Sequence, residues 1–319
     1  MRHVFILNPA AGKVEAAVAL KPEIEAFFQH YPMDYRIYIT ERPGHATEVV
    51  KAELETGDAV RLYACGGDGT LLEVLNGMDG KDNGELACIP CGSGNDFLRM
   101  MPDREGWNDW KALVMGTAKS VDAIRCNDRL ALNMCSMGVD ADVANRMVKY
   151  KHLPFVSGPM AYNLALVNTF LRPLGQSLRV VMETPEGTVE RKGKFMFALA
   201  ANGQYYGGGY HGSPLSQPDD GLLDFVLVSK ISHLKMLSIL GLYKNGQHLD
   251  LPCCETFRGS KMQVLAETPA CVTADGECFS TTVVSFELLP AAVRFVFPAP
   301  DYEELLKNYK NSQKCQIKT

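Results

Sequence analysis

The sequence predicts an α/β domain built on a parallel sheet, followed by a mainly antiparallel, β-sandwich-like domain with inserted helices. The chain has 319 residues, about twice the length of an average domain. In its first third, continuous apolar runs alternate with helical patterns, which is typical of parallel strands covered on both faces. After Val121 the apolar runs become short and separated by turns, as in antiparallel sheets.

The first domain is expected to alternate strand and helix four times. Continuous apolar runs predict strands at residues 3–7, 35–40, 61–65 and 85–90. Apolar positions three and four residues apart predict helices at residues 14–30, 46–55, 70–76 and 95–101. Such an order predicts parallel strands joined by helical crossovers.

The second domain is expected to begin with a hairpin, because the runs 122–126 and 130–136 flank the turn pair Asn127-Asp128. Further strands are predicted at residues 178–183, 195–202, 222–228, 261–266 and 283–289. Further helices are predicted at residues 143–150, 160–171, 233–244 and 301–309. We place one domain at residues 1–122, with 293–319 returning to it, and the other at 123–292.

The composition excludes several classes of protein. Hydrophobic residues make up 46% of the chain and charged residues 22%, as in globular proteins and unlike disordered ones. The net charge of −5 and the scattered Lys and Arg residues predict no nucleic-acid surface. No stretch of about 18 clean apolar residues predicts a membrane span. Because a signal-peptide pattern is also missing, we expect a cytoplasmic protein with reduced cysteines.

Three glycine-rich turns each follow a predicted strand of the first domain, at residues 8–13, 66–70 and 92–96. Because the carboxyl ends of parallel strands meet at one edge of the sheet, we expect the three turns to converge on one ligand. Glycines let backbone N–H groups approach a phosphate, and Lys13 adds a mobile positive charge. Asp68, an acid between glycines, indicates Mg²⁺ or its water at the same place.

Familiar phosphate-binding motifs do not account for these turns. Gly12-Lys13 lacks the earlier glycine and the following Ser or Thr of a Walker A loop. The protein-kinase signature set is also missing. A GxGxxG pattern occurs at Gly207, Gly209 and Gly212, but a proline-rich segment follows it where a dinucleotide site needs a helix.

Two acidic motifs of the second domain each allow two interpretations. Residues 219–224 (DDGLLD) are either an acidic turn before a strand or a cation site. Residues 275–277 (DGE) are either a hairpin turn or the carboxylates that accept a hydroxyl proton during phosphoryl transfer. The sequence leaves open whether Asp275 or Glu277 would hold that proton.

Taken together, these motifs resemble the soluble diacylglycerol kinase and sphingosine kinase superfamily, in its bacterial branch. The resemblance rests on NPAAGK at 8–13, GGDGTLLEVLNG at 66–77, GSGNDF at 92–97, DDGLLD at 219–224 and ADGE at 274–277. It implies a nucleotide-binding, NAD-kinase-like α/β domain and a C-terminal β-sandwich for the lipid substrate, with the active site between them.

The resemblance also implies roles for individual residues. Asp275, Glu277 and Asp68 would be catalytic, with Asp275 as the base and Glu277 supporting it. A Mg²⁺ ion would be held by Asp220 and by the main-chain carbonyls of Gln217 and Leu222. ATP would be held by Asn8, Pro9, Ala10, Ala11, Gly12, Lys13, Thr40, Gly66, Gly67, Asp68, Gly69, Thr70, Leu71, Leu72, Glu73, Ser93, Asn95 and Asp96.

The expected function is therefore an ATP- and Mg²⁺-dependent kinase of a membrane lipid hydroxyl, with diacylglycerol as the first candidate and phosphatidic acid as its product. Residues 143–174 are the candidate lipid-contacting segment, and the protein would be peripheral to the membrane. Alternatives are a kinase of a sphingoid base or ceramide, an NAD-kinase-like enzyme for a soluble alcohol, and a non-catalytic nucleotide-binding regulator. A homodimer is left open.

Overall fold

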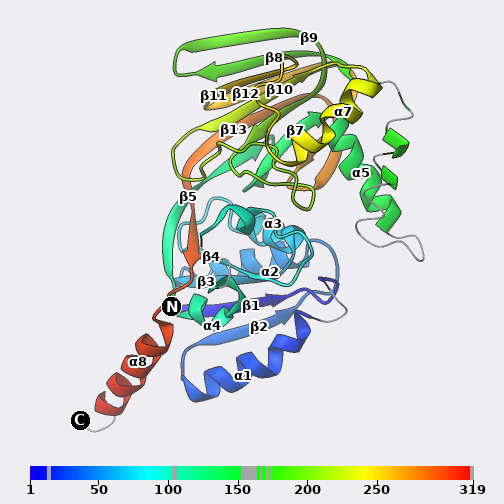
Figure 1. Cartoon of the computed structure of the whole chain (residues 1–319). Helices are drawn as coiled ribbons and strands as arrows, with labels where there is room; N and C mark the ends of the chain where they lie inside the picture. Colours follow the sequence, from blue (N-terminus) through cyan, green and yellow to red (C-terminus); the bar gives the residue numbers. More distant parts are fainter. Residues whose placement is uncertain are drawn as a thin grey trace. The chain divides into compact units, whose positions relative to one another are not determined.

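The computed structural model describes residues 1–12, 16–102, 106–151, 164–165, 167–169, 172 and 174–316. The chain divides into two compact units, one formed by Met1–Val121 with Ala292–Thr319 and the other by Asp122–Ala291 (Figure 1). The chain passes between the units twice, within β5 (Thr117–Cys126) and within β13 (Glu277–Phe297). Most of its strand pairs are antiparallel, and the parallel pairs belong to the first unit.

In the first unit, β1 (Arg2–Leu7) pairs in parallel with β2 (Tyr35–Ile39) on one side and β3 (Val60–Gly66) on the other. β3 continues the order to β4 (Gly84–Pro90), and Phe295 of β13 pairs in parallel with Leu86 of β4. Because all four strands run in one direction, the loops after Leu7, Ile39, Gly66 and Pro90 leave the sheet at the same edge.

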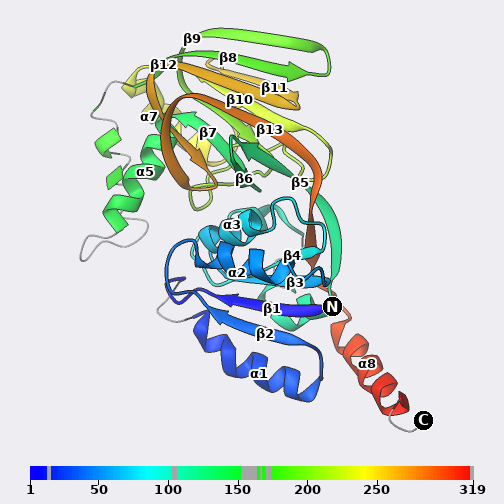
Figure 2. The ribbon, with the colours of Figure 1, turned by 180° about the vertical axis from the view of Figure 1, so that it is seen from behind.

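Four helices of the first unit pack on this sheet through aromatic and small residues: α1 (Lys21–His30), α2 (His45–Leu54), α3 (Asp68–Gly77) and α4 (Trp110–Val114). A further helix, α8 (Tyr302–Gln316), contacts α4 and the end of α1 instead. The rings of Phe5 and Tyr63 stack 4.1 Å apart, and Phe28 of α1 and Trp110 of α4 meet Phe5 edge-on. α2 and α3 lie side by side in both views (Figures 1 and 2), because Gly77 leaves room for Val50.

Two predicted helices of this unit differ from the structure. The helix expected at 14–30 is a short 3-10 turn, Val18–Leu20, followed by α1, which has a proline in its first turn; Val14 lies outside the described residues. The helix expected at 95–101 is wrong and is only the 3-10 turn Phe97–Met100. The reason is that Asn95 has a φ of 49° and donates its N–H to the Asp68 carboxylate. α4 was not predicted.

His3 predicts that the stability of the first unit depends on pH. Burial, with nearby Arg61, lowers the pKa of His3 to about 4, and its Nδ1 lies 2.7 Å from the Tyr63 hydroxyl. Because the folded pKa is below the unfolded value, stability is full above about pH 6.5 and is lost as the pH falls toward 4. Between pH 7 and 5 we expect this residue to cost about 2 kcal/mol.

Urea unfolding of wild type and His3→Gln at the two pH values measures this contribution. The variant is expected to lose less stability on acidification than wild type. Equal losses in both proteins would assign the acid sensitivity to other groups, among them His248, whose pKa burial also lowers to about 4.

The second unit is built on a closed circuit of strands. Its elements are β6 (Arg129–Ala131), β7 (Met134–Gly138), α5 (Val139–Lys151), β8 (Gln176–Thr184), β9 (Gly187–Ala201), β10 (Leu223–Ser229), α7 (His233–Lys244), β11 (Cys254–Gly259) and β12 (Lys261–Ala274). β8 pairs with both β9 and β12, and β7 pairs with the later halves of the same two strands. This circuit encloses a core that includes Val180, Phe225, Val264 and Phe286, each fully buried.

Several predictions for the second unit need correction. The hairpin at Asn127-Asp128 is confirmed, but residues 130–136 form two strands, β6 and β7. β12 and β13 are much longer than the predicted 261–266 and 283–289, and β11 was missed. Much of the predicted helix 160–171 and of the lipid-contacting segment 143–174 lies outside the described residues. Among the described helices, none combines the length and the apolar character that crossing a membrane requires.

Candidate active site

The three glycine-rich turns of the first unit contact one another at the carboxyl edge of the sheet. A Cβ atom on Gly12 would lie 2.0 Å from the carbonyl oxygen of Cys91, and one on Gly92 would lie 2.4 Å from the Cα of Gly67. The N–H groups of Cys91 and Gly92 both donate to the carbonyl of Gly66, at 2.8 and 3.1 Å. Glycine is required here because any side chain would push the turns apart.

Asp68, the first residue of α3, holds the third turn in place. Its Oδ2 accepts the N–H of Asn95 at 2.8 Å, and its Oδ1 accepts the N–H of Asp96 at 2.7 Å. Gly94 lies so close that a Cβ there would be 2.4 Å from Oδ2. In this structure the carboxylate therefore shapes the turn at residues 92–96 through two charge-assisted hydrogen bonds.

The predicted nucleotide-binding residues fall into two groups. Ala10, Gly12, Gly69 and Ser93 are exposed, and Asn8, Pro9, Thr40, Gly67, Asp68, Glu73 and Asn95 are partly exposed. Ala11, Gly66, Thr70, Leu71, Leu72 and Asp96 are buried, so the two leucine side chains belong to the core. Lys13 lies outside the described residues.

Asn8 and Glu73, two further residues of this set, hold neighbouring elements together. Asn8 donates from Nδ2 to the hydroxyl of Thr70 at 2.8 Å, which ties the first turn to the first turn of α3. Glu73 accepts the N–H of Ala46 at 3.2 Å, and its carbonyl accepts the Thr47 hydroxyl, so it caps the start of α2. The arrangement leaves exposed glycine backbone beside the N-terminus of α3, which is suited to bind an anion such as a phosphate.

In the second unit, the DGE motif is a two-residue hairpin turn. Ala274 of β12 pairs with Glu277 of β13, and the residues between them, Asp275 and Gly276, have φ values of 47° and 95°. Positive φ at both central residues defines a type I′ turn, for which Asp-Gly is a favoured sequence.

The side chains of Asp275 and Glu277 have different surroundings. The Asp275 carboxylate accepts the backbone N–H groups of Leu132 at 2.6 Å, of Asn133 at 3.1 Å and of Met134 at 2.7 Å. These N–H groups lie at and just before the start of β7, so Asp275 binds the backbone where the predicted single strand is divided into β6 and β7. Glu277 has a side chain that is 51% exposed, and it lies 3.3 Å from Arg129. Glu277 is therefore the more accessible of the two carboxylates.

Two residues that the sequence did not single out connect the acidic motifs of this unit. Buried Asp122 accepts the N–H of Gly221 at 2.8 Å and that of Ala291 at 2.7 Å. Fully buried Asn202 donates from Nδ2 to the carbonyls of Asp122 and Leu132. The sequence gives only weak signals for these two residues. Asp122 is an acid within an otherwise mostly apolar run, and Asn202 precedes a glycine at the end of another run.

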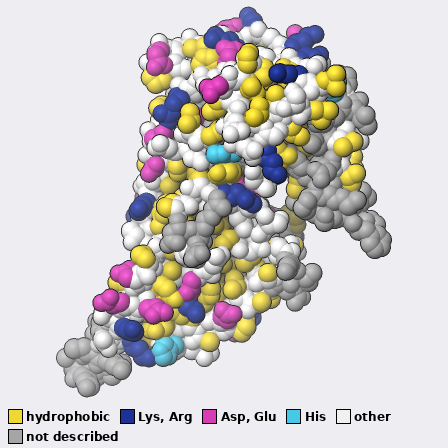
Figure 3. All heavy atoms as spheres, viewed as in Figure 1, with side chains coloured by type: hydrophobic (Ala, Val, Ile, Leu, Met, Phe, Trp, Pro, Cys, Tyr) yellow, Lys and Arg dark blue, Asp and Glu magenta, His cyan; other side chains and the backbone are white. Residues whose placement is uncertain are grey.

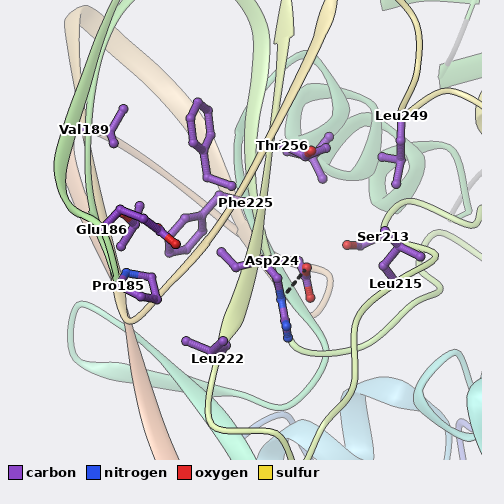
Figure 4. Close-up of a pocket in the computed structure, with 14 residues that line it drawn as sticks. Pro185, Glu186, Val189, Ser213, Leu215, Leu222, Asp224, Phe225, Leu249 and Thr256 are labelled. Atoms are coloured by element: carbon purple, nitrogen blue, oxygen red, sulfur yellow. Dashed lines mark ion pairs between the residues drawn. The ribbon is translucent and has the colours of Figure 1, made fainter.

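Asp220, the predicted carboxylate ligand of Mg²⁺, pairs with a cation of the chain itself. Arg258 contacts Oδ2 of Asp220, while Oδ1 of Asp220 accepts the N–H of Leu222 at 3.1 Å. The same guanidinium lies 3.2 Å from the carboxylate of Asp224, because Asp224 of β10 is directly opposite Arg258 of β11 in the antiparallel pair. Figure 4 draws the pair with Asp224 as a dashed line in a pocket of about 550 Å³. Burial raises the pKa of Asp224.

A Mg²⁺ ion at Gln217, Asp220 and Leu222 would therefore have to displace Arg258 from the Asp220 carboxylate. The guanidinium already balances the Asp220 charge where the divalent ion would bind. Within the described part of the chain, no cluster of three or more His, Cys, Asp or Glu side chains is arranged to hold a metal ion, but the predicted site needs only one such side chain beside two main-chain carbonyls.

We expect Arg258→Gln to destabilise the second unit by about 1–2 kcal/mol, because buried Asp224 would lose its charged partner. Thermal unfolding checks this, with Arg179→Gln, which breaks an exposed ion pair with Glu190, as the matched control.

Thermal unfolding of wild type in Mg²⁺ and in EDTA tests the predicted metal site. Because Arg258 already pairs with Asp220, wild type is expected to melt at the same temperature in both solutions. A clear rise of the wild-type melting temperature in Mg²⁺ would instead restore the predicted metal site.

Comparison with known proteins assigns the family. Residues 2–126 match the model of the diacylglycerol kinase catalytic domain, and residues 133–297 match that of the YegS C-terminal NAD kinase beta sandwich-like domain. The fold and the matched domains define a kinase, and the chain belongs to the bacterial lipid kinase branch of the diacylglycerol kinase superfamily.

Individual relatives cover nearly the whole chain. A Pseudomonas aeruginosa protein named "Probable lipid kinase YegS-like" is 30% identical over 291 residues, which is 91% of each chain. A Mycobacterium tuberculosis protein named "Diacylglycerol kinase" is 29% identical over 307 residues, covering 92% of this chain and 94% of its own. The crystal structure of a diacylglycerol kinase from Bacillus anthracis superposes with a TM-score of 0.65 at 20% identity, covering 94% and 98% of the two chains, and supports the fold.

Proposed function

We propose that this protein transfers the γ-phosphoryl group of ATP to the hydroxyl of a membrane lipid, with diacylglycerol as the substrate and phosphatidic acid as the product. The observation that carries the proposal is the contact between three glycine-rich turns at the N-terminus of α3, in the unit that matches the diacylglycerol kinase catalytic domain. Relatives named diacylglycerol kinase support the choice of lipid.

The first unit would bind the nucleotide, and the second would bind the lipid. The exposed backbone at Ala10, Gly12 and Gly69 and the hydroxyl of Ser93 would hold the phosphates, with Thr40 nearer the base. Lys13 would add a positive charge. Asp68 would act by holding the turn at 92–96 in its binding shape. Mg²⁺ bound with ATP would neutralise phosphate charge in the transition state.

Glu277 would accept the proton of the lipid hydroxyl. A general base needs accessible lone pairs, and the side chain of Glu277 is half exposed and held by one arginine. Asp275 would serve as a positioning residue, because three backbone N–H groups occupy its carboxylate.

An assay with labelled ATP over mixed micelles tests the proposal. Micelles would contain diacylglycerol, a sphingoid base or ceramide in turn, and NAD would serve as a soluble acceptor. Phosphatidic acid is expected as the main product. Phosphorylation of a sphingoid base, of ceramide or of NAD would move the protein to that substrate class, and binding of ATP without any transfer would make it a regulator.

A further inference from the structure

Helix α7 (His233–Lys244) of the second unit exposes large apolar side chains. Leu234 is 81% exposed, Leu237 57% and Leu242 36%, whereas Ile239 is buried. A helix of a soluble domain normally turns its apolar residues toward the core. Leu234 and Leu237 lie one turn apart, so they form a contiguous apolar surface, and such a surface is a candidate binding site.

The two faces of α7 are both apolar. With about 100° of rotation per residue, Leu234, Leu237 and Gly241 share one face, and Met236, Ile239 and Tyr243 share the opposite one. Met236 and Tyr243 pack against the core that includes Leu199 and Val226, and Ile239 is buried. The first group points to solvent, because the exposures of Leu234 and Leu237 are the highest on the helix among the large apolar residues.

Two exposed lysines lie on the same helix. By the same rotation, Lys244 lies about 20° from Leu237, within the leucine face, and Lys235 lies about 100° from Leu234, toward the opposite face. From Lys230 to Leu249 the sequence contains no Asp or Glu, although the whole chain has a net charge of −5. The backbone carbonyl of exposed Arg172 also lies 3.0 Å from the His233 ring, which brings another basic residue to the start of α7. Figure 3 shows yellow hydrophobic and dark blue basic side chains together on the surface of this unit.

We propose that α7 docks the protein on an anionic lipid bilayer, with Leu234 and Leu237 entering the acyl region and Lys235 and Lys244 reaching the headgroups. The charge pattern selects this partner: exposed leucines that share a helix with two exposed lysines, with no acid from Lys230 to Leu249, are complementary to a negatively charged membrane surface. A second copy of a chain with net charge −5 offers these lysines less attraction than an anionic bilayer does. The inference rests on the proposed function, because a kinase of a membrane lipid must work where that lipid resides.

Sedimentation with vesicles tests the surface without ATP or lipid substrate. The vesicles are phosphatidylcholine with or without phosphatidylglycerol. The test variant is Leu234→Glu with Leu237→Glu, and the matched control is Leu215→Glu with Val283→Glu, two residues of the same unit that are 69% and 44% exposed. Wild type and the control are expected to bind the anionic vesicles, and the test variant at least about tenfold more weakly. Equal binding by both double variants would overturn the proposal.

Charge and assembly give two further readouts. Lys235→Gln with Lys244→Gln should weaken binding by about fivefold per lysine, and added salt should weaken wild type in the same way. Vesicle binding that changes neither with the lysine substitutions nor with added salt would contradict the charge argument. If wild type binds no vesicles and the leucine variant instead changes the mass in analytical ultracentrifugation, the surface joins two copies and the bilayer proposal is wrong.

Activity distinguishes a failure of docking from a failure of the proposed function. In detergent micelles, which present the lipid without a bilayer, the leucine variant should keep wild-type turnover, and on anionic vesicles it should lose at least about tenfold. If the protein phosphorylates no lipid but its binding to vesicles still depends on the leucines, the proposed function is wrong and the proposed docking surface is supported. An unchanged melting temperature of the variant excludes unfolding as the cause.

Discussion

Glu277→Gln is expected to lower turnover on diacylglycerol micelles by about 10² to 10⁴, because it removes the proposed proton acceptor and keeps its shape. ATP affinity, measured by titration, should hardly change. The melting temperature should also stay close to wild type, since the lost ion pair with Arg129 is exposed.

The matched control is Glu287→Gln on the same strand, where the carboxylate pairs with Lys261 at a similar exposure. It should keep its turnover. Retained turnover in Glu277→Gln would exclude this residue as the base.

Asp275→Asn tests whether Asp275 has a different role from Glu277 in the same turn. One amide oxygen replaces two carboxylate oxygens that accept the N–H groups of Leu132, Asn133 and Met134. We therefore expect a stability loss of about 2–4 kcal/mol in urea unfolding, together with lower turnover. A variant with full stability and greatly reduced turnover would make Asp275 the base, which is the role that the sequence resemblance implies first.

Asp68→Ala is expected to abolish most activity, with a loss of at least about 10²-fold in turnover over KM, because the turn at 92–96 loses both of its anchors. The binding of ATP should weaken as well, since the backbone that would hold the phosphates no longer keeps its shape. Isothermal titration with ATP, beside initial rates, measures both effects.

Asp68→Asn should retain part of the ATP binding, because its amide oxygen can still accept one of the two N–H groups. Exposed Asp82 of the same unit provides a matched control as Asp82→Ala. If Asp68→Ala binds ATP as tightly as wild type but loses its Mg²⁺ dependence, the acid organises a metal ion as the sequence first indicated.

The sequence by itself was enough to locate the glycine-rich and acidic motifs and the strands and turns that depend only on residues close together in the chain. Continuous apolar runs predict strands at 3–7, 61–65 and 85–90 within a residue or two of β1, β3 and β4, because the middle of a strand covered on both faces is apolar. The Asn127-Asp128 hairpin was equally predictable, since its turn needs residues that accept positive φ, and Asn127 has a φ of 53°. Glycines spaced after strands predict the converging turns for the same local reason.

Only the tertiary structure decided what each acid does. Asp68, Asp122 and Asp275 bind backbone N–H groups that are 27 to 169 residues away, and no local pattern records such partners. The same holds for Arg258, which meets Asp220 and Asp224 because β10 and β11 pair in one particular register. A carboxylate has the same letter in the sequence whether it clamps a turn, pairs with an arginine or accepts a proton. Which role it takes depends on the neighbours that folding brings to it, because hydrogen bonds and burial act at distances of a few ångströms in space and not along the chain.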